Sequence, residues 1–191
     1  PPAVVDALTS AMLESGVKPV RFLDPSAGTG IFGQYADLAN PSAEITCFEK
    51  DPLTALILKH LNPTFTVREQ GFESIEGKYN GYYDVIASNI PYGDVALFDP
   101  AFSTHIDPVR RQGTRTLHNY FFMKSVDTVR DGGIIAFIAS QGVLNSEQNR
   151  PVREWLAQRC NVVSAVRLPN NLFTDYAGTE VGSDLIVLQK R

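Results

Sequence analysis

The sequence is poor in cysteine and in long hydrophobic runs. Its 191 residues include only two cysteines, Cys47 and Cys160, too few for a disulfide framework and not spaced as metal ligands. His60, His105 and His118 have no ligand spacing either, so we expect no metal site. No apolar run reaches the roughly 18 residues that cross a bilayer, and no signal-peptide pattern is present. These features favour a cytoplasmic protein without a membrane segment.

An excess of positive charge is also lacking. The formal net charge is −4, which excludes a global electrostatic attraction to nucleic acid. If the substrate is DNA or RNA, its affinity must come from another domain or from a local basic loop, for which Arg110, Arg111 and Arg115 are the candidates. The sequence opens on Pro1-Pro2 without a methionine. We therefore expect one domain, residues 1–191, excised from a longer protein with fused domains.

The strongest local signal is the turn at residues 24–30, Asp-Pro-Ser-Ala-Gly-Thr-Gly. It follows an apolar stretch that suits a buried strand and precedes a helical pattern that begins at Ile31. Glycines at such a turn allow positive φ and let a ligand approach the backbone closely. The turn lacks the Lys-Ser/Thr pair of a phosphate loop. An acid, Asp24, beside the glycines suits a ligand with a cationic amine, and a purely structural turn is the alternative.

Strand and helix patterns alternate along the chain. We expect helices over residues 2–15, 31–38, 51–61, 117–130 and 147–159, and strands over 20–23, 44–49, 64–68, 83–87, 134–139, 162–168 and 184–188. About 14 residues join the last two strands, too few for a parallel crossover. We therefore predict an α/β fold, a three-layer α/β/α sandwich with a mostly parallel seven-stranded sheet whose last strand is antiparallel.

Three local expectations go with this fold. Residues 94–116 show no clear periodicity and are expected to form a long loop, functional or disordered. The buried side of helix 51–61 is expected to hold Leu53, Leu56, Ile57 and Leu61. Residues 131–133, Asp-Gly-Gly, are expected to close helix 117–130.

Two further positions suit ligand contacts. Glu49 ends the second strand, 25 residues after Asp24, and in dinucleotide-binding folds an acid at roughly this distance binds ribose hydroxyls. Phe72, which follows the third strand in Gln70-Gly-Phe-Glu73, offers a stacking face. A solvated acid at a strand end and a phenylalanine in the core are the respective alternatives.

The motifs carry a resemblance to a known family. Residues 24–30 resemble the first motif of S-adenosylmethionine-dependent methyltransferases, and residues 89–92, Asn-Ile-Pro-Tyr, resemble the Asn/Asp-Pro-Pro-Tyr/Phe motif of amino-group methyltransferases. Residues 117–146 and 167–189 look like the N6-adenine DNA methyltransferases, in particular methylase domains joined to large helicase-like proteins of mobile elements. The resemblance implies a Rossmann-like methyltransferase fold and S-adenosylmethionine as the cofactor.

The resemblance also implies which residues bind the cofactor. These are Asp24, Ser26, Ala27, Gly28, Gly30, Glu49, Lys50, Phe72, Glu73 and Asn89. Glu49 would hold the ribose and Phe72 the adenine ring. The family often places an acid directly before this phenylalanine, but here that position is Gly71, and Glu73 is a candidate substitute.

For catalysis the resemblance points to Asn89, Ile90, Pro91 and Tyr92. A ring-conjugated amine is a poor nucleophile, but the Asn89 side-chain carbonyl and the backbone carbonyl of residue 90 can accept its N–H bonds and aim its lone pair at the methyl group. Tyr92 would stack on a base taken out of the helix, and Phe173 would pack on the other side of that base. Ile90 stands where the family has a proline, so the loop loses one fixed φ.

The leading hypothesis is methyl transfer from S-adenosylmethionine to the N6 amine of adenine in DNA. Adenine in RNA or a glutamine amide in a protein would suit the same motif. A non-catalytic cofactor-binding or DNA-docking module is the alternative from another class, motivated by Ile90 and Gly71. No stretch is long enough for a separate target-recognition region, so we predict weak or no sequence-specific DNA binding by this chain alone.

Overall fold

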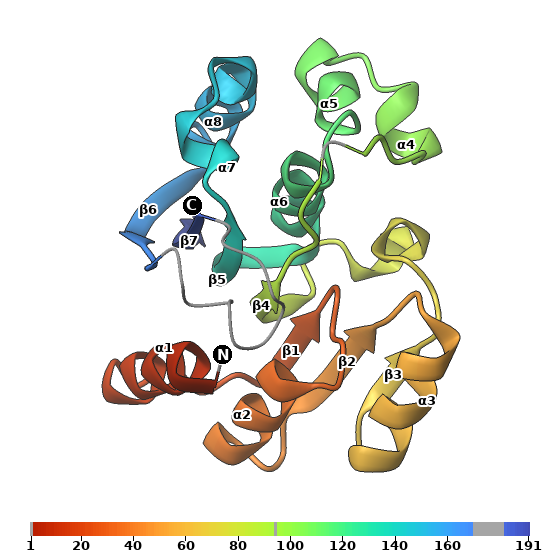
Figure 1. Ribbon diagram of the computed structural model, residues 1–191, viewed down its shortest axis with the longest axis vertical. Coiled ribbons are helices and arrows are strands. Elements are labelled where there is room, and N and C mark those ends of the chain that lie inside the picture. Colours follow the sequence, from red (N-terminus) through yellow and green to blue (C-terminus); the bar gives the residue numbers. More distant parts are fainter. Residues whose placement is uncertain (1, 94, 170–181) are drawn as a thin grey trace.

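The computed structural model describes residues 2–93, 95–169 and 182–191, and a seven-stranded sheet lies at its centre (Figure 1). The strands are β1 (Arg21–Asp24), β2 (Glu44–Phe48), β3 (Thr66–Arg68), β4 (Tyr83–Asn89), β5 (Val129–Ser140), β6 (Cys160–Arg167) and β7 (Ser183–Lys190). Their order across the sheet is β3-β2-β1-β4-β5-β7-β6. Strands β1 to β5 pair in parallel, and β7 pairs antiparallel with both β5 and β6. The predicted sheet with its reversed last strand is confirmed.

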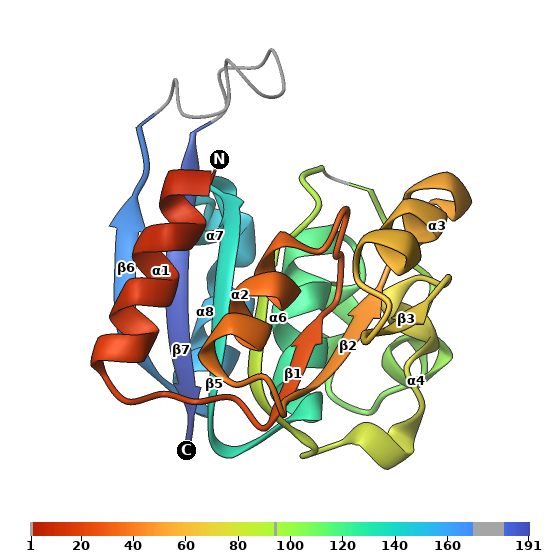
Figure 2. The ribbon, with the colours of Figure 1, turned by 90° about the horizontal axis from the view of Figure 1, so that it is seen from below.

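Helices cover both faces of this sheet (Figure 2). They are α1 (Pro2–Glu14), α2 (Ile31–Ala39), α3 (Pro52–Leu61), α4 (Pro100–Ser103), α5 (Pro108–Gly113), α6 (Leu117–Thr128), α7 (Gly142–Asn145) and α8 (Arg150–Ala157), with 3₁₀ turns at Phe72–Ser74, Gly77–Tyr79 and Glu147–Asn149. Helices α1, α2 and α3 lie on one face, and α4 to α8 lie on the other (Figure 1). One apolar cluster fills each side, so the predicted three layers are present. Among the described residues, no helix is both long and apolar enough to cross a membrane.

The segment expected to be an irregular loop contains two short helices. Helices α4 and α5 each begin at the proline of an Asp-Pro pair. The carboxylates of Asp99 and Asp107 accept hydrogen bonds from the backbone N–H groups of Ala101 (2.8 Å) and Val109 (2.9 Å), respectively. Asp51 caps α3 in the same way. Helices of four and six residues are too short to show an apolar period, so the loop prediction was wrong, although the capping signal was present.

The predicted buried face of α3 was also wrong. Leu53, Leu56, Ile57 and Leu61 are all exposed, and the helix instead buries Ala55 and Leu58. Leu58 packs closely against the glycine turn. An ideal β-carbon built on Gly30 would lie only 2.5 Å from the Cδ1 atom of Leu58. Because Gly30 has no side chain, Leu58 can bring α3 close to the turn. The leucine-rich side of α3 faces outward.

The end of α6 differs from the expectation as well. The helix ends at Thr128 and β5 begins at Val129, so Asp131-Gly132-Gly133 lies inside the strand. Tyr83 of β4 pairs with Val129, and the register shifts before Val85 pairs with Ile134. Gly132 has φ +75°, a conformation that suits the irregular start of a strand and that glycine adopts without strain.

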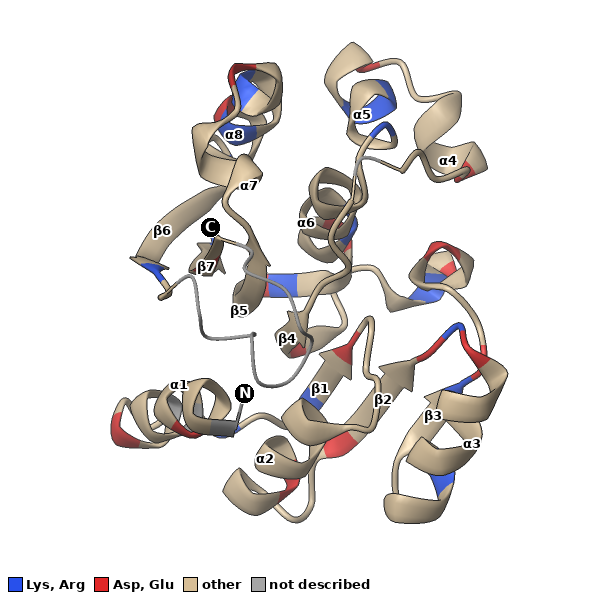
Figure 3. Ribbon diagram, viewed as in Figure 1, with Lys and Arg blue, Asp and Glu red and all other residues tan. Residues whose placement is uncertain are grey.

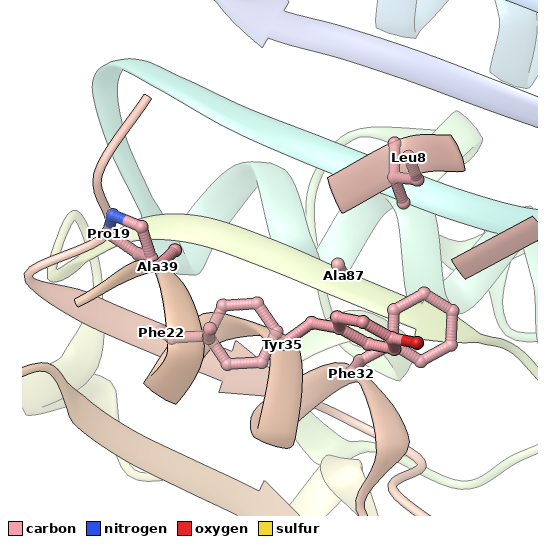
Figure 4. Close-up of a pocket in the computed structure, with 8 residues that line it drawn as sticks. Leu8, Pro19, Phe22, Phe32, Tyr35, Ala39 and Ala87 are labelled. Atoms are coloured by element: carbon pink, nitrogen blue, oxygen red, sulfur yellow. The ribbon is translucent and has the colours of Figure 1, made fainter. Parts of the chain in front are cut away.

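The cavity shown in Figure 4 is a packing gap. It lies between α1, α2 and the sheet, has a volume of about 20 Å³, and is lined by Leu8, Phe22, Phe32, Tyr35 and Ala87 among others. Such a volume holds at most a single water, and an apolar lining offers that water no partners. The face of the sheet covered by α1 and α2 therefore has no ligand site at this position.

A buried charge pair holds the segment before α4 against α6. The Asp99 carboxylate accepts hydrogen bonds from the Tyr120 hydroxyl (2.6 Å) and the Lys124 ammonium (3.0 Å), and all three side chains are buried. Burial alone would raise the pKa of Asp99, but these hydrogen bonds and the Lys124 charge bring the pKa below its ordinary value. The pair therefore anchors the end of residues 95–98, which line the cavity described below.

Replacing Lys124 with methionine should lower the free energy of unfolding by about 3–5 kcal/mol, because it leaves the Asp99 charge buried without its cation. Urea denaturation would measure this change. The double variant Lys124→Met/Asp99→Asn should recover part of the loss, since no charge then remains buried. A loss below about 1 kcal/mol in the single variant would match a solvent-screened pair and would contradict this account.

Candidate active site at the carboxyl edge of the sheet

A cavity of about 490 Å³ opens at the carboxyl ends of β1, β2 and β4. Its walls come from the turn after β1, the end of β2, the segment after β3 and the loop after β4. They include Ser26, Glu49, Phe72, Pro91 and Phe121. Ligand cavities in proteins measure roughly 300–1,000 Å³. In open α/β sheets they lie at this edge, where neighbouring loops diverge.

Asp24 is the last residue of β1, and its side chain is fully buried beside the cavity wall. Its Oδ1 atom accepts hydrogen bonds from the backbone N–H of Ser26 (3.1 Å) and from the Ser88 hydroxyl (2.6 Å). Its Oδ2 atom is buried without a hydrogen-bond partner in the described part of the chain. Burial, partly offset by these two hydrogen bonds, raises the pKa of Asp24 from 3.8 to about 7, with a further contribution from the negative charge of Glu49.

The raised pKa predicts a pH dependence of folding stability. The folded protein holds a proton on Asp24 between pH 3.8 and about 7, where the unfolded chain has lost it, so the contribution of this residue to stability falls as pH rises through that window. Three pKa units correspond to a free energy on the order of 4 kcal/mol. Denaturation midpoints of wild type should therefore fall relative to those of Asp24→Asn between pH 4 and pH 8. Parallel curves for the two proteins would show that Asp24 is ionised throughout.

Glu49 follows β2 and organises the glycine turn. Its Oε2 atom accepts a hydrogen bond from the backbone N–H of Gly28 (2.9 Å), and its Oε1 atom accepts one from the N–H of Asp51 (2.8 Å). Gly28 has φ +54°, which turns its N–H toward this carboxylate at no steric cost. Glu49 and Lys50 both line the cavity. Each carboxylate oxygen keeps further acceptor capacity for a ligand hydroxyl.

In the segment after β3, the Glu73 carboxyl group lies at the position of residue 71, where the family often has an acid and this chain has a glycine. Gly71, Phe72 and Glu73 all line the cavity. An ideal β-carbon on Gly71 would lie 2.5 Å from Cδ of Glu73, so the Glu73 carboxyl group occupies the space where a side chain at residue 71 would start. Gly71 has φ −74°, which any residue can adopt, so the limit on its side chain comes from Glu73 and not from the backbone. Phe72 is almost fully buried and packs against the rings of Phe48 and Phe121.

The residues of the Asn-Ile-Pro-Tyr motif lie at the end of β4 and in the following loop. Asn89 ends the strand with an exposed side chain, and Ile90 is buried and donates its backbone N–H to Ile138 O of β5 (3.1 Å). Pro91 lines the cavity, whereas Asn89 is not one of its lining residues. Tyr92 is half-buried beside Ser183, and burial raises the pKa of its hydroxyl to about 12. Its phenol is therefore neutral at physiological pH.

The predicted basic loop offers fewer cations for phosphates than the sequence suggested. Arg110 pairs with Asp127 and stacks on Phe102, and Arg111 donates to backbone carbonyls. Arg115 is exposed. Lysine and arginine are scattered over several elements and do not gather on one face (Figure 3). Phe173, predicted to pack on the target base, lies outside the described residues.

Sequence reasoning missed several residues that build the site. Ser88, immediately before Asn89, donates a hydrogen bond to Asp24, and its signal was a hydroxyl directly after the apolar run of residues 85–87. Leu97 and Phe98 line the cavity although they are distant in sequence from the motifs. Local patterns could not reveal them, because a hydrogen bond from Leu97 N to Thr114 O (2.9 Å) positions this segment.

The residues present fit S-adenosylmethionine. A buried carboxylate oxygen without a partner lies behind the turn, Glu49 presents acceptors for ribose hydroxyls, and Phe72 with Glu73 forms an aromatic and acidic wall. A cavity with carboxylates and few cations suits a ligand that carries an ammonium and a sulfonium charge. No group of three or more His, Cys, Asp or Glu that could hold a metal occurs among the described residues.

Solved structures share this fold. A Listeria monocytogenes protein assigned to the class I S-adenosylmethionine-dependent methyltransferases matches 100% of this chain and 60% of its own, with TM-score 0.80 and 19% identity. The type IIG restriction endonuclease BpuSI matches 100% of this chain and 25% of its own, with TM-score 0.74 and 18% identity. A Pyrococcus horikoshii protein assigned as an RNA methyltransferase covers 98% and 83%, with TM-score 0.65 and 17% identity. The fold is therefore that of class I methyltransferases.

Sequence comparison identifies one family within the class I methyltransferases. The family described as N-6 DNA methylase matches residues 53–191, and the chain belongs to that family. Among curated proteins, "Defense against restriction protein B" of Escherichia phage P1 is 23% identical over 194 aligned residues. The match covers 100% of this chain and 8% of that protein, so the chain spans only a small part of its relative's length. The predicted methyltransferase family is confirmed.

Proposed function

We propose that the chain transfers a methyl group from S-adenosylmethionine to the N6 amine of adenine in DNA. The observation that carries this proposal is the position of the Asn-Ile-Pro-Tyr motif, at the end of β4 with Pro91 in the wall of the cofactor cavity. Membership of the N-6 DNA methylase family supports it. The phage P1 protein and BpuSI, whose names both concern restriction, also support DNA as the substrate.

The cofactor would supply an electrophilic methyl group on a sulfonium centre. Glu49 would accept hydrogen bonds from the ribose hydroxyls, and Phe72 and Glu73 would contact the adenine ring. The Asn89 side-chain carbonyl and the Ile90 backbone carbonyl would accept the two N–H bonds of the target amine and orient its lone pair. Tyr92 would offer a neutral aromatic face to the unstacked base. The new N–CH3 bond would replace the S–CH3 bond of the sulfonium, which would leave as a neutral thioether, and the amine would lose one proton to solvent.

The charge of the chain offers DNA little electrostatic attraction outside the proposed active site. Arg110 and Arg111 are engaged within the fold, and the net charge is −4. We expect the chain alone to bind DNA weakly and with little sequence preference at physiological salt. Tight, site-specific binding by this chain would contradict that expectation.

The decisive experiment measures transfer of a radiolabelled methyl group to adenine-containing DNA, to the same sequence as RNA, and to a glutamine-containing peptide, with nucleoside analysis of the product. We expect N6-methyladenine in DNA. RNA is the second candidate acceptor, because the fold is shared with the P. horikoshii protein assigned as an RNA methyltransferase. Cofactor binding without transfer to any of the three acceptors would identify a binding module and overturn the proposal.

A further inference from the structure

The two outermost strands of the sheet differ in length. One is β3, which has three residues, Thr66–Arg68, and the other is β6, which has eight residues, Cys160–Arg167 (Figure 2). In the part of the chain that the structure describes, β7 is the strand that pairs with β6, and no strand lies on the outer side of β6. The backbone N–H and C=O groups that point outward from β6 can therefore pair with another strand.

Strand β6 is apolar as well as long. Its three valines are largely exposed: Val162 (64%), Val163 (58%) and Val166 (48%). The strand contains no acid and one base, Arg167, whose guanidinium pairs with the buried Asp184. Outermost strands usually resist association through short length, charged side chains or a bulge. A register shift lies before Ser164, but residues 164–167 pair regularly with β7 beyond it, so this strand has the features of an interaction surface.

An apolar cavity of about 210 Å³ lies beside this strand, between β6, β7 and helices α6, α7 and α8. Val162 and Ala165 of β6 line it, and both are exposed, so the cavity reaches the surface at this side of the sheet. Among its described lining residues only Arg153 is charged, and its guanidinium donates to Val143 O (3.2 Å) and Ser146 O (2.6 Å). An apolar cavity of about 150 Å³ accepts benzene, so this one has room for an aromatic or branched side chain.

Two arginines lie at the start of β6. The guanidinium of Arg159 stacks on Trp155, with its Cζ atom 3.9 Å from the ring centroid, and the Arg159 backbone carbonyl accepts a hydrogen bond from Arg191 N (2.9 Å). The Nε atom of Arg191 donates to the Asn161 side chain in β6 (2.9 Å). Neither guanidinium forms an ion pair within the described residues. Two positive charges at one end of the strand favour a partner that carries negative charge there.

We propose that β6 binds an extended segment of a partner protein as an additional strand of the sheet. Main-chain hydrogen bonds join the segment to β6, and a large apolar side chain of the partner enters the cavity beside Val162 and Ala165. An acidic side chain of the partner lies beside Arg159 and Arg191. Strand β6 contains no acid, so a second copy of β6 lacks this complementary charge. The inference does not depend on the proposed function, because this cavity and the cofactor cavity share no described lining residue.

A fluorescently labelled synthetic peptide is the probe, and its affinity is measured by anisotropy. It alternates valine and threonine, with one phenylalanine near its centre and two glutamates at one end. One version has the glutamates at its amino end and another at its carboxyl end, because an added strand can run parallel or antiparallel to β6. We expect one version to bind at micromolar concentrations. Replacing its phenylalanine with alanine should weaken binding by about 10-fold or more, and replacing its glutamates with glutamine should weaken binding and reduce its salt dependence.

Variants of the chain test the same contacts. Ala165→Trp fills the cavity from an exposed position and should weaken peptide binding by about 10-fold or more. Arg191→Glu should also weaken binding and should favour a peptide with lysines in place of the glutamates. Val163→Trp is the matched control, because Val163 lies in the same strand but does not line the cavity, and it should bind the peptide as wild type does. The S-adenosylmethionine affinity of all three variants should stay within about twofold of wild type, because the sites are separate.

Hydrogen exchange shows whether the peptide pairs with β6. Amide protection in residues 160–167 should rise on binding, because N–H groups on the outer side of β6 become hydrogen-bonded. Binding without this protection, or equal binding by Ala165→Trp and wild type, would place the peptide elsewhere and overturn the inference, as would failure of both peptide versions to bind. Dimerisation of the chain that is lost in Val166→Lys, but kept when the exposed Leu38 of α2 is changed to lysine, would show that a second copy occupies β6 and would overturn the assignment to a partner protein.

Discussion

Asn89→Ala should lower the rate of methyl transfer by about 10²–10³-fold, the usual effect of removing one positioned hydrogen-bonding group from a transition state. The same change should leave S-adenosylmethionine affinity unaltered, because the exposed side chain of Asn89 is not part of the cofactor cavity wall. Single-turnover rates with radiolabelled cofactor and calorimetry would measure the two quantities separately. The substitution removes an exposed side chain at the end of a strand, so it should cost little folding stability.

Asn89→Asp is the matched control for this experiment. It keeps an acceptor oxygen at the same position, and the family motif allows either residue, so it should retain much more activity than the alanine variant. Equal rates for Asn89→Ala and wild type would show that this residue does not hold the acceptor amine. An equal loss of cofactor affinity and rate would instead assign Asn89 to the cofactor.

The second large effect concerns the acid beside Phe72. Glu73→Ala should weaken S-adenosylmethionine binding by about 10–100-fold, as expected for a hydrogen bond to a charged group worth about 1.5–3 kcal/mol. Gly71→Asp alone should also weaken binding, since a β-carbon at residue 71 would meet the Glu73 carboxyl group and two carboxylates would then repel each other. The double variant Gly71→Asp/Glu73→Ala should recover affinity, because the acid then stands at the position usual for the family.

A base-specific readout distinguishes recognition from simple packing. Wild type should prefer S-adenosylhomocysteine over S-inosylhomocysteine, which carries an oxygen in place of the adenine amine and so has no donor for Glu73 at that position. Glu73→Ala should lose this preference, and the double variant should regain it. A double variant that binds no better than either single variant would refute the exchange of roles between residues 71 and 73.

Fold prediction from sequence succeeded where local patterns agree with their tertiary environment. The apolar run in residues 134–139 lies in β5, between β4 and β7, as its lack of polar positions indicates. The reversed last strand followed from a connection too short for a parallel crossover. The buried face of α3 was mispredicted because leucine content does not decide which side of a helix meets the sheet. Close packing of Leu58 against Gly30 decides it.

Site prediction had a similar limit. Glycine turns, strand-end acids and the Asn-Ile-Pro-Tyr motif are local, and the topology of a parallel sheet brings its strand ends to one edge. The engagement of Arg110 by Asp127 and Phe102 was not predictable, because it depends on how α5 packs on α6. The same holds for the folding of the Glu73 carboxyl group over Gly71.

The sequence by itself determined the fold class, the methyltransferase family and the order of the motif loops, because these depend on hydrophobic periodicity, turn chemistry and short-range spacing. Only the tertiary structure decided the burial of Asp24 beside the hydroxyl of Ser88 and the shape of the cavity at the carboxyl edge of the sheet. Burial and cavity shape arise from contacts between elements far apart in the chain, and local patterns do not specify those contacts.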